Sequence, residues 1–245
     1  MELYDSLIRK AEALTGASAP RRYAFSPARA WPETKDFELV MLRDAAYELG
    51  GSGKSAVNLT CVTTSPKLVE KNEIVVIGPD LGELRGDTPF ARLALLRVGD
   101  IESDEDDGGE QAFRAIQNID FVKYHVFPRG YMMRTSSESN REQVRVSRAA
   151  LKDGMSFERI GNAFLRRYKA DPNVLAVKLV FVTAPDADYA GLSECAKNAR
   201  DVTLTLSKIL EGMPADCGSC ALKSICDEVE GMRELHFGKE KHTTE

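Results

Sequence analysis

Three cysteines near the end of the sequence have the spacing of a metal site. Cys217, Cys220 and Cys226 form a C-x2-C-x5-C array within the stretch CGSCALKSIC. Two cysteines separated by two residues can reach one metal centre across a tight turn, and Gly218 removes the side chain where that turn is most crowded. The N-terminal residues lack the apolar run of a secretory leader, so metal binding fits the cysteines better than a disulfide framework. The array therefore predicts three thiolates that converge on one metal centre.

The kind of metal centre depends on the fourth ligand. A [4Fe-4S] cluster takes four ligands, usually all cysteines, and we expect one here. We expect Cys195 to be the fourth ligand, with Cys61 and then His236 as the alternatives. Zinc is the main rival, because tetrahedral sites of four cysteines, or of three cysteines and a histidine, are common. Zinc sites usually pair two short motifs, however, and this sequence shows one. Three reduced thiols without metal are the remaining alternative.

A second motif, GGSGKS at residues 50–55, is close to a phosphate-binding loop. The standard loop needs a glycine where Glu48 stands, and this carboxylate would repel a phosphate. The variant with two adjacent glycines needs a lysine where Leu49 stands. A phosphate loop also opens onto the N-terminus of a helix, whereas the following AVNLTCVTT favours a strand. We therefore predict a hairpin turn at this motif, with a P-loop-like ATPase as a remote alternative.

The elements that must position these motifs are predicted from apolar periodicity. Strands are expected at 37–42, 56–62, 73–78, 93–101 and 173–184, and helices at 110–127, 147–153, 156–170 and 189–212. Strands come first and helices cluster later, which predicts an α+β fold of mixed layers rather than strict βαβ alternation. We expect one compact domain at residues 37–212, an N-terminal helix and proline-rich arm at 1–36, and a cysteine-rich metal-binding segment at 213–245. The single tryptophan, Trp31, lies in this arm and is expected to dock on the core or on a partner.

A cluster of arginines lies just before and at the start of the helix predicted at 147–153. Arg129, Arg134, Arg141, Arg145 and Arg148 lie within twenty residues and could bind an anionic ligand. Acidic side chains are interspersed among them, at positions 138 and 142. Such mixed charge favours a solvated helix face, and this is the interpretation that we adopt.

Composition narrows the classes of partner. The 245 residues carry a formal net charge of -5, whereas binding to nucleic acid needs clustered Lys and Arg. No stretch of the sequence reaches the roughly 18 apolar residues of a membrane span. We therefore expect a cytoplasmic protein that has neither a nucleic acid nor a membrane as its partner.

Three stretches together resemble one known family. They are NEIVVIGPDLGEL (72–84), VRVSRAALKDGMSFERIGNAFL (144–165) and VLAVKLVFVTAPDADY (174–189). They look like the middle domain of the acetyl-CoA synthase β subunit, the partner of carbon monoxide dehydrogenase. In that domain an IVGPD turn, an RVS helix start and a strand ending near T-D occur in this order. The resemblance covers roughly residues 37–200, and it places YELGGSGKSAVNLTCV on a strand, a turn and a further strand.

The resemblance carries expectations about function. The family's catalytic domain carries a nickel-iron-sulfur cluster, with four cysteines for the cubane and a Cys-Gly-Cys motif for the distal nickel. This sequence contains no Cys-Gly-Cys. The resemblance therefore implies a stand-alone relative of the middle domain, without the nickel-cluster domain. We expect an iron-sulfur protein that serves as an accessory or electron-transfer component in one-carbon, corrinoid-linked metabolism, with a corrinoid or redox enzyme as its partner. The alternative is a cluster-free or zinc-stapled interaction module that docks on a larger enzyme through residues 1–36.

Overall fold

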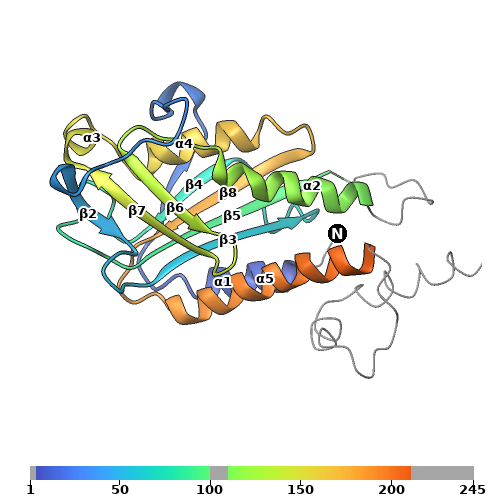
Figure 1. Ribbon diagram of the computed structural model, residues 1–245. Coiled ribbons are helices and arrows are strands. Elements are labelled where there is room, and N and C mark those ends of the chain that lie inside the picture. The colour runs from blue at the N-terminus through green and yellow to red at the C-terminus, as the bar shows by residue number, and fades with distance from the viewer. Residues whose placement is uncertain (1–3, 100–109, 211–245) are drawn as a thin grey trace, which may run out of the picture.

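The computed structural model describes residues 4–99 and 110–210 (Figure 1). It confirms the predicted α+β class. The helices are α1 (Asp5–Ala13), α2 (Glu110–Phe121), α3 (Arg148–Lys152), α4 (Phe157–Tyr168) and α5 (Tyr189–Leu210), with short 3-10 turns η1 (Pro27–Arg29), η2 (Leu42–Asp44) and η3 (Val122–Tyr124). The strands are β1 (Arg21–Ala24), β2 (Ala45–Leu49), β3 (Ala56–Thr63), β4 (Glu73–Ile77), β5 (Phe90–Val98), β6 (Tyr131–Ser136), β7 (Arg141–Ser147) and β8 (Val174–Val182).

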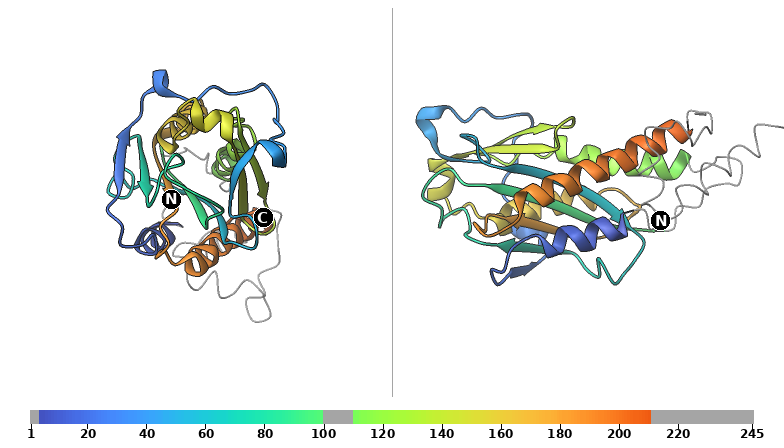
Figure 2. Two further views of the ribbon diagram at one scale, coloured as in Figure 1. Left: turned by 90° about the vertical axis from the view of Figure 1, so that its left-hand side faces the viewer. Right: turned by 90° about the horizontal axis from the view of Figure 1, so that it is seen from below.

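A mixed five-stranded sheet forms the centre of the fold, in the order β1-β4-β8-β5-β3. Strands β4 and β8 run parallel, as do β3 and β5, whereas β5 and β8 are antiparallel. The central strands are buried on both faces, which explains their nearly continuous apolar sequences. Helices α1 and α5 cover one face, and α4 packs on β4 and β8 (Figure 2).

A second, antiparallel sheet has the order β2-β7-β6 and lies against β3 and β5 through β7. Strands β6 and β7 form a hairpin that the sequence analysis did not predict, since it assigned this stretch to a solvated helix face. Alternate residues of β7 are buried, namely Glu142, Val144 and Val146. This period of two belongs to a half-buried strand, so the helical interpretation was wrong.

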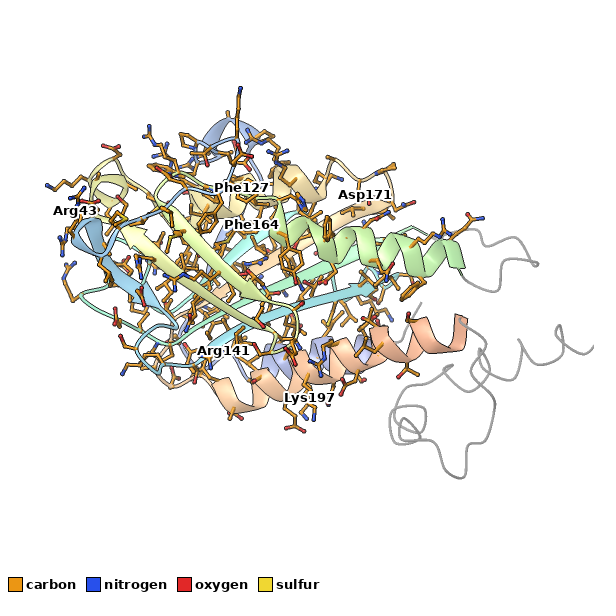
Figure 3. The ribbon with its side chains drawn as sticks, viewed as in Figure 1. Arg43, Phe127, Arg141, Phe164, Asp171 and Lys197 are labelled. Carbon is orange, nitrogen blue, oxygen red and sulfur yellow. The ribbon has the colours of Figure 1, made fainter. Side chains whose placement is uncertain are left out.

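Helix α4 shows why the local sequence folds as predicted. The Ser156 hydroxyl accepts a hydrogen bond from the backbone N-H of Arg159, which caps the helix N-terminus. The buried face of the helix includes Phe157, Ile160 and Phe164. Phe164 points into the interior, whereas side chains such as Lys197 lie at the periphery (Figure 3). Core packing and the cap together hold this helix against β4 and β8 of the main sheet.

The N-terminal residues are part of the packed core and do not form a separate arm. Ile8 on α1 and Tyr4 directly before it are buried, and α1 packs against α5 and β3. Strand β1 extends the main sheet by pairing with β4. Trp31 is 2% exposed; its indole N-H donates to the Arg129 carbonyl at 2.7 Å, and the Arg159 guanidinium lies 4.3 Å from its ring centre. The expectation that Trp31 docks on the core is therefore confirmed.

Residues 37–41 do not form the strand that their apolar pattern predicts. They run without a ladder partner past the start of β6, and bonds between backbone and side chains hold them. The Gly130 N-H donates to the Glu38 carboxylate at 2.6 Å, Arg145 donates to the Val40 carbonyl at 2.9 Å, and the Val40 N-H donates to the Met132 sulfur at 3.4 Å. Val40 is buried, whereas its neighbour Leu39 is 70% exposed. The strand prediction was wrong because apolar alternation alone cannot supply a neighbouring strand.

Among the described helices, none combines the length and the apolar character that a membrane crossing requires.

Candidate functional site: a polar cavity between the two sheets

The GGSGKS motif lies in the loop between β2 and β3, two strands that belong to different sheets. The predicted hairpin is therefore wrong, although the strand predicted after the loop is confirmed as β3. Gly50, Ser52 and Gly53 have positive φ angles. The Asp87 carboxylate is hydrogen-bonded to this loop. It accepts hydrogen bonds from the Glu48 N-H at 2.7 Å and from the Ser52 hydroxyl at 2.5 Å. These two bonds, the side-chain bond first, lower the pKa of Asp87. A carboxylate of the chain itself thus accepts hydrogen bonds from the loop. A strand follows the loop, whereas a phosphate site needs a helix there.

The five cysteines considered as cluster ligands, Cys61 among them as an alternative fourth ligand, fall into two groups. Cys217, Cys220 and Cys226 lie outside the described residues. Cys195 lies on α5 at 0% exposure, within the hydrophobic core, and Cys61 on β3 is 1% exposed. Burial raises the pKa of both thiols, which disfavours the thiolate that metal binding requires. Within residues 4–99 and 110–210 no cluster of three metal-ligating side chains occurs.

A buried ion pair joins the two sheets at their centre. Arg92 on β5 and Glu142 on β7 both have fully buried side chains. The guanidinium donates through Nε to Oε1 at 2.8 Å and through Nη2 to Oε2 at 2.5 Å, and it lies 4.3 Å from the ring centre of Phe164. A bidentate pair of this kind compensates two charges that would each be costly to bury alone. Glu142, expected on a solvated face, is instead a central interior residue.

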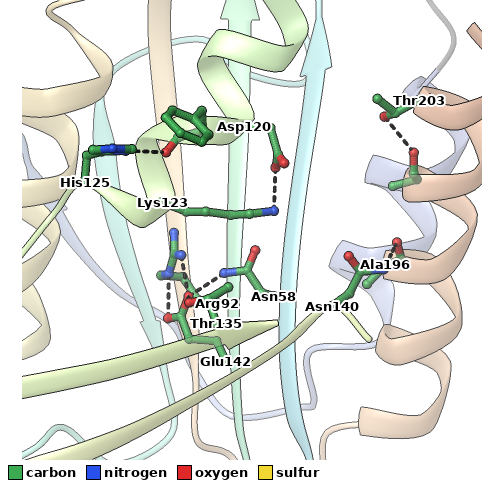
Figure 4. Close-up of polar contacts among 12 residues, drawn as sticks. Asn58, Arg92, Asp120, Lys123, His125, Thr135, Asn140, Glu142, Ala196 and Thr203 are labelled. Atoms are coloured by element: carbon green, nitrogen blue, oxygen red, sulfur yellow. Dashed lines mark hydrogen bonds and ion pairs between the residues drawn. The ribbon is translucent and has the colours of Figure 1, made fainter. Parts of the chain in front are cut away.

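The side-chain amide of Asn58 on β3 extends this pair toward a cavity. Its Nδ2 donates to Glu142 Oε2 at 2.5 Å, which fixes the amide orientation because a carboxylate cannot accept from the amide oxygen. The amide oxygen therefore faces away from the ion pair, toward the side of Lys123 (Figure 4). Asn58 is also fixed through its backbone, since its N-H donates to the Asn140 carbonyl at 2.8 Å.

Lys123 and Asp120 lie across from Asn58, at the junction of α2 and η3 (Figure 4). The Lys123 ammonium donates to Asp120 Oδ1 at 2.7 Å and lies 5.2 Å from the ring centre of Tyr124. The lysine side chain is 6% exposed, whereas that of Asp120 is 41% exposed. The Asp120 carboxylate thus retains contact with solvent, whereas the Lys123 side chain is buried.

A cavity of about 360 Å³ opens between these groups and α5. We call it the polar cavity, and its polar lining consists of Asn58, Thr60, Asp120, Lys123, Ser137, Glu138, Asn140, Arg200 and Thr203. On the α5 side, the Thr203 hydroxyl bonds to the Tyr4 hydroxyl at 2.9 Å. Figure 4 shows Asn140, which donates to the Ala196 carbonyl at 3.0 Å. A smaller cavity of about 180 Å³, next to β6, shares Lys123 with the polar cavity. Lys123 therefore stands between the two cavities.

Several buried polar atoms around the ion pair and the polar cavity have no hydrogen-bond partner within the described part of the chain. They include Asn58 Oδ1, Thr60 Oγ1, the hydroxyls of Tyr124 and Tyr131, and Arg200 Nε. Each such atom costs about 1–3 kcal/mol if it is left without a partner. Burial also raises the pKa of Tyr131 and Tyr168, so both hydroxyls stay protonated and can donate. The region is thus suited to a polar occupant, either water or a small molecule.

The sequence analysis missed this site. One signal was present, because Arg92 interrupts the otherwise apolar run FARLALL, and a charge inside a buried strand needs a partner. Nothing in the sequence identified that partner, which lies 50 residues further along. Of the five clustered arginines, Arg145 pairs with Glu48 at 2.7 Å and Arg129 with Asp153 at 3.4 Å, so they do not converge on one site.

Fold and site together define a class of protein: a mixed-sheet α+β domain with a polar, partly open cavity of ligand size. The family described as CO dehydrogenase/acetyl-CoA synthase complex beta subunit matches residues 34–187. This match spans more than half of the 245 residues, so the chain belongs to that family. The resemblance to the acetyl-CoA synthase domain is thereby confirmed. No curated protein matches the sequence significantly.

Proposed function

We propose that this chain is an iron-sulfur accessory subunit of one-carbon metabolism, which carries a [4Fe-4S] cluster on its C-terminal cysteines and docks on a corrinoid or redox enzyme. The observation that carries the proposal is the combination of a family domain with the C-x2-C-x5-C array. The array begins at Cys217, seven residues after α5 ends at Leu210. The family takes its name from a multi-subunit complex, which supports a protein partner.

The cluster ligands can be ranked by burial. A bound [4Fe-4S] cluster would supply one-electron transfer, and Cys217, Cys220 and Cys226 are the residues we assign to hold it. The sequence ranks Cys195 first as the fourth ligand, but its thiol is buried and would have to leave the core in order to bind. Cys61 on β3 is 1% exposed and faces the same obstacle. Burial therefore moves His236 ahead of both cysteines in our proposal.

An exposed apolar segment supports docking. Among residues 37–42, four large apolar side chains are 50–73% exposed, namely Phe37, Leu39, Met41 and Leu42. Contiguous apolar surface of this kind typically marks an interaction site. The segment falls inside the range that matches the family, whereas the predicted docking arm, residues 1–36, contributes α1 and β1, which pack against the rest of the fold. We therefore place the partner surface at residues 37–42.

The test of the cluster is purification of the full chain without oxygen, followed by analysis of iron, zinc and acid-labile sulfide. We expect about four irons and four sulfides per chain. Cys217→Ala should lose most of this iron, whereas the matched variant Cys61→Ala should keep it because that thiol is a core residue. Cys195→Ala decides the fourth ligand, since retained iron in this variant excludes Cys195. Stoichiometric zinc without sulfide would instead support the zinc-stapled interaction module, and a metal-free protein would refute both metal proposals.

The test of docking compares two leucines that are both well exposed. Leu39→Glu should abolish co-purification with a partner that mass spectrometry identifies as a corrinoid or redox enzyme. Leu175 lies near the start of β8 and is 49% exposed, so Leu175→Glu should leave co-purification unchanged. Equal loss in both variants, or in neither, would refute the assignment of the partner surface to residues 37–42.

A further inference from the structure

We propose that the polar cavity binds a small zwitterionic molecule of the amino-acid type, with its ammonium group against Asn58 and Asp120 and its carboxylate against Arg200 and Thr60. This inference goes beyond the proposed function, since neither the cluster nor the docking surface requires it. It rests on the unpaired polar atoms of the cavity, the balance of charge in its lining, and its volume.

The unpaired atoms define what the ligand must offer. Asn58 is 3% exposed, and its amide oxygen is held toward the cavity by the bond from its nitrogen to Glu142. That oxygen can only accept, so the ligand must present a donor there. Arg200 Nε can only donate, so the ligand must present an acceptor on the α5 side. The Thr60 hydroxyl can do either. A molecule with a donor at one end and an acceptor at the other satisfies all three groups.

The charges indicate that both ends are ionised. The lining contains two acidic side chains, Asp120 and Glu138, and two basic ones, Lys123 and Arg200. Arg200 also donates through Nη2 to the Asp201 carboxylate at 3.3 Å and through Nη1 to the Glu138 carbonyl, so its Nε is the nitrogen left for a ligand. A single anion or cation would meet repulsion as well as attraction in such a site, whereas a molecule that carries both charges can place each beside its opposite. Asp120 has one oxygen engaged by Lys123 and a side chain that is 41% exposed, so it can accept from a second ammonium.

The volume limits the size of the ligand. About 360 Å³ is at the small end of the range for ligand pockets, which favours a small metabolite over a nucleotide or a peptide. The apolar lining, Ala196, Ala199 and Leu204, belongs entirely to α5 and can accommodate a short side chain. These residues and Arg200 lie beyond the range that matches the family. The ligand site is therefore built in part from residues outside the matched family domain.

The experiment is isothermal titration calorimetry on the full chain with the common L-amino acids as probes. Acetate and ethylammonium, each with one of the two charges, serve as the comparison probes at matched ionic strength. We expect saturable binding of at least one amino acid and at least tenfold weaker binding of both single-charge probes, a difference of about 1.4 kcal/mol. Absence of binding by every amino acid would overturn the proposal, because the cavity would then hold only water. Equal binding of acetate would overturn the zwitterionic class.

A matched pair of variants localises the binding. Thr60→Val removes an unpaired hydroxyl, so the ligand-free protein should be at least as stable as the wild type while amino-acid affinity falls about tenfold. Thr183→Val makes the same chemical change at the end of β8, where the hydroxyl donates to the Pro79 carbonyl at 2.6 Å. It should lower stability and leave the affinity unchanged. An unchanged affinity in Thr60→Val would remove the polar cavity as the binding site. The metal content of the protein does not enter this test, so its failure and the failure of the cluster proposal are distinguishable.

Discussion

The buried pair of Arg92 and Glu142 gives the sharpest prediction about stability. Both side chains are fully buried, and two hydrogen bonds of 2.8 and 2.5 Å join them. Removal of one partner leaves the other charge buried and unpaired, which costs about 3–5 kcal/mol. We therefore expect Glu142→Gln and Arg92→Met each to lower the free energy of unfolding by about this amount. For a chain of this size the loss corresponds to about 6–20 °C in Tm.

The double variant Arg92→Met/Glu142→Gln separates ion pairing from packing. It removes both charges, and the glutamine oxygen can still accept the hydrogen bond from Asn58. Replacement of a whole buried pair is often close to neutral, so the double variant should recover most of the stability lost by either single variant. Urea unfolding of the four proteins measures this coupling. A double variant that loses the sum of the two single losses would refute the reasoning, because the two residues would then act independently.

The pH dependence of the single variant provides a second check on the same pair. In Arg92→Met the Glu142 carboxylate has no cation, so the folded protein takes up a proton there more readily than the unfolded chain does. Its stability should then rise as the pH falls from about 8 to about 5, because the folded state binds the extra proton. The exposed pair of Arg129 and Asp153 is the control: Arg129→Met should change stability by less than about 1 kcal/mol, since both side chains are more than half exposed.

Three further predictions follow from single positions. The pKa of Asp87 is lowered in the folded protein, so its carboxylate stabilises the fold at pH values above the pKa of about 3.9 in the unfolded chain. Urea unfolding should therefore show the wild type to be more stable than Asp87→Asn at neutral pH, and this difference should vanish as the pH falls below about 4. A difference that persists in acid would contradict this. Gly78 has φ of +97°, and a Cβ there would lie 2.4 Å from the backbone nitrogen of Ala184, so Gly78→Ala should lower Tm more than any surface Gly→Ala change; an unchanged Tm would count against the close approach. Burial raises the pKa of Cys61 and Cys195, so a thiol reagent should modify both slowly in the folded chain and rapidly in denaturant. Quantitative mass spectrometry of the two cysteine peptides measures these rates. Fast labelling of Cys195 in the folded protein would show that its thiol leaves the core.

The sequence predicts those elements whose apolar pattern is strong by itself. Strands β3, β4 and β8 and helices α4 and α5 were predicted because buried strands are continuous apolar runs and α4 has one apolar face. The β6–β7 hairpin was missed because its residues are mostly polar and only their alternation, ending at Val144 and Val146, marks them as strands. Residues 37–42 show the converse, since their alternation lacks a neighbouring strand.

The site itself depends on contacts that a single sequence does not reveal. Asn58, Arg92 and Glu142 come from three strands in two sheets, and only the fold brings them within hydrogen-bond distance. The same is true of Tyr4, directly before α1, and Thr203 on α5, which are 199 residues apart and joined by a hydrogen bond. The cysteine array, in contrast, is visible at once because its three members are close in sequence.

The most direct test of the proposed function is a low-temperature EPR spectrum of the full chain, purified without oxygen and then reduced. We predict the signal of a reduced [4Fe-4S] cluster in the wild type and its loss in Cys217→Ala. A protein that binds iron stoichiometrically should also be brown before reduction and bleach on reduction. A colourless wild-type protein without an EPR signal, prepared in the same way, would contradict the iron-sulfur proposal.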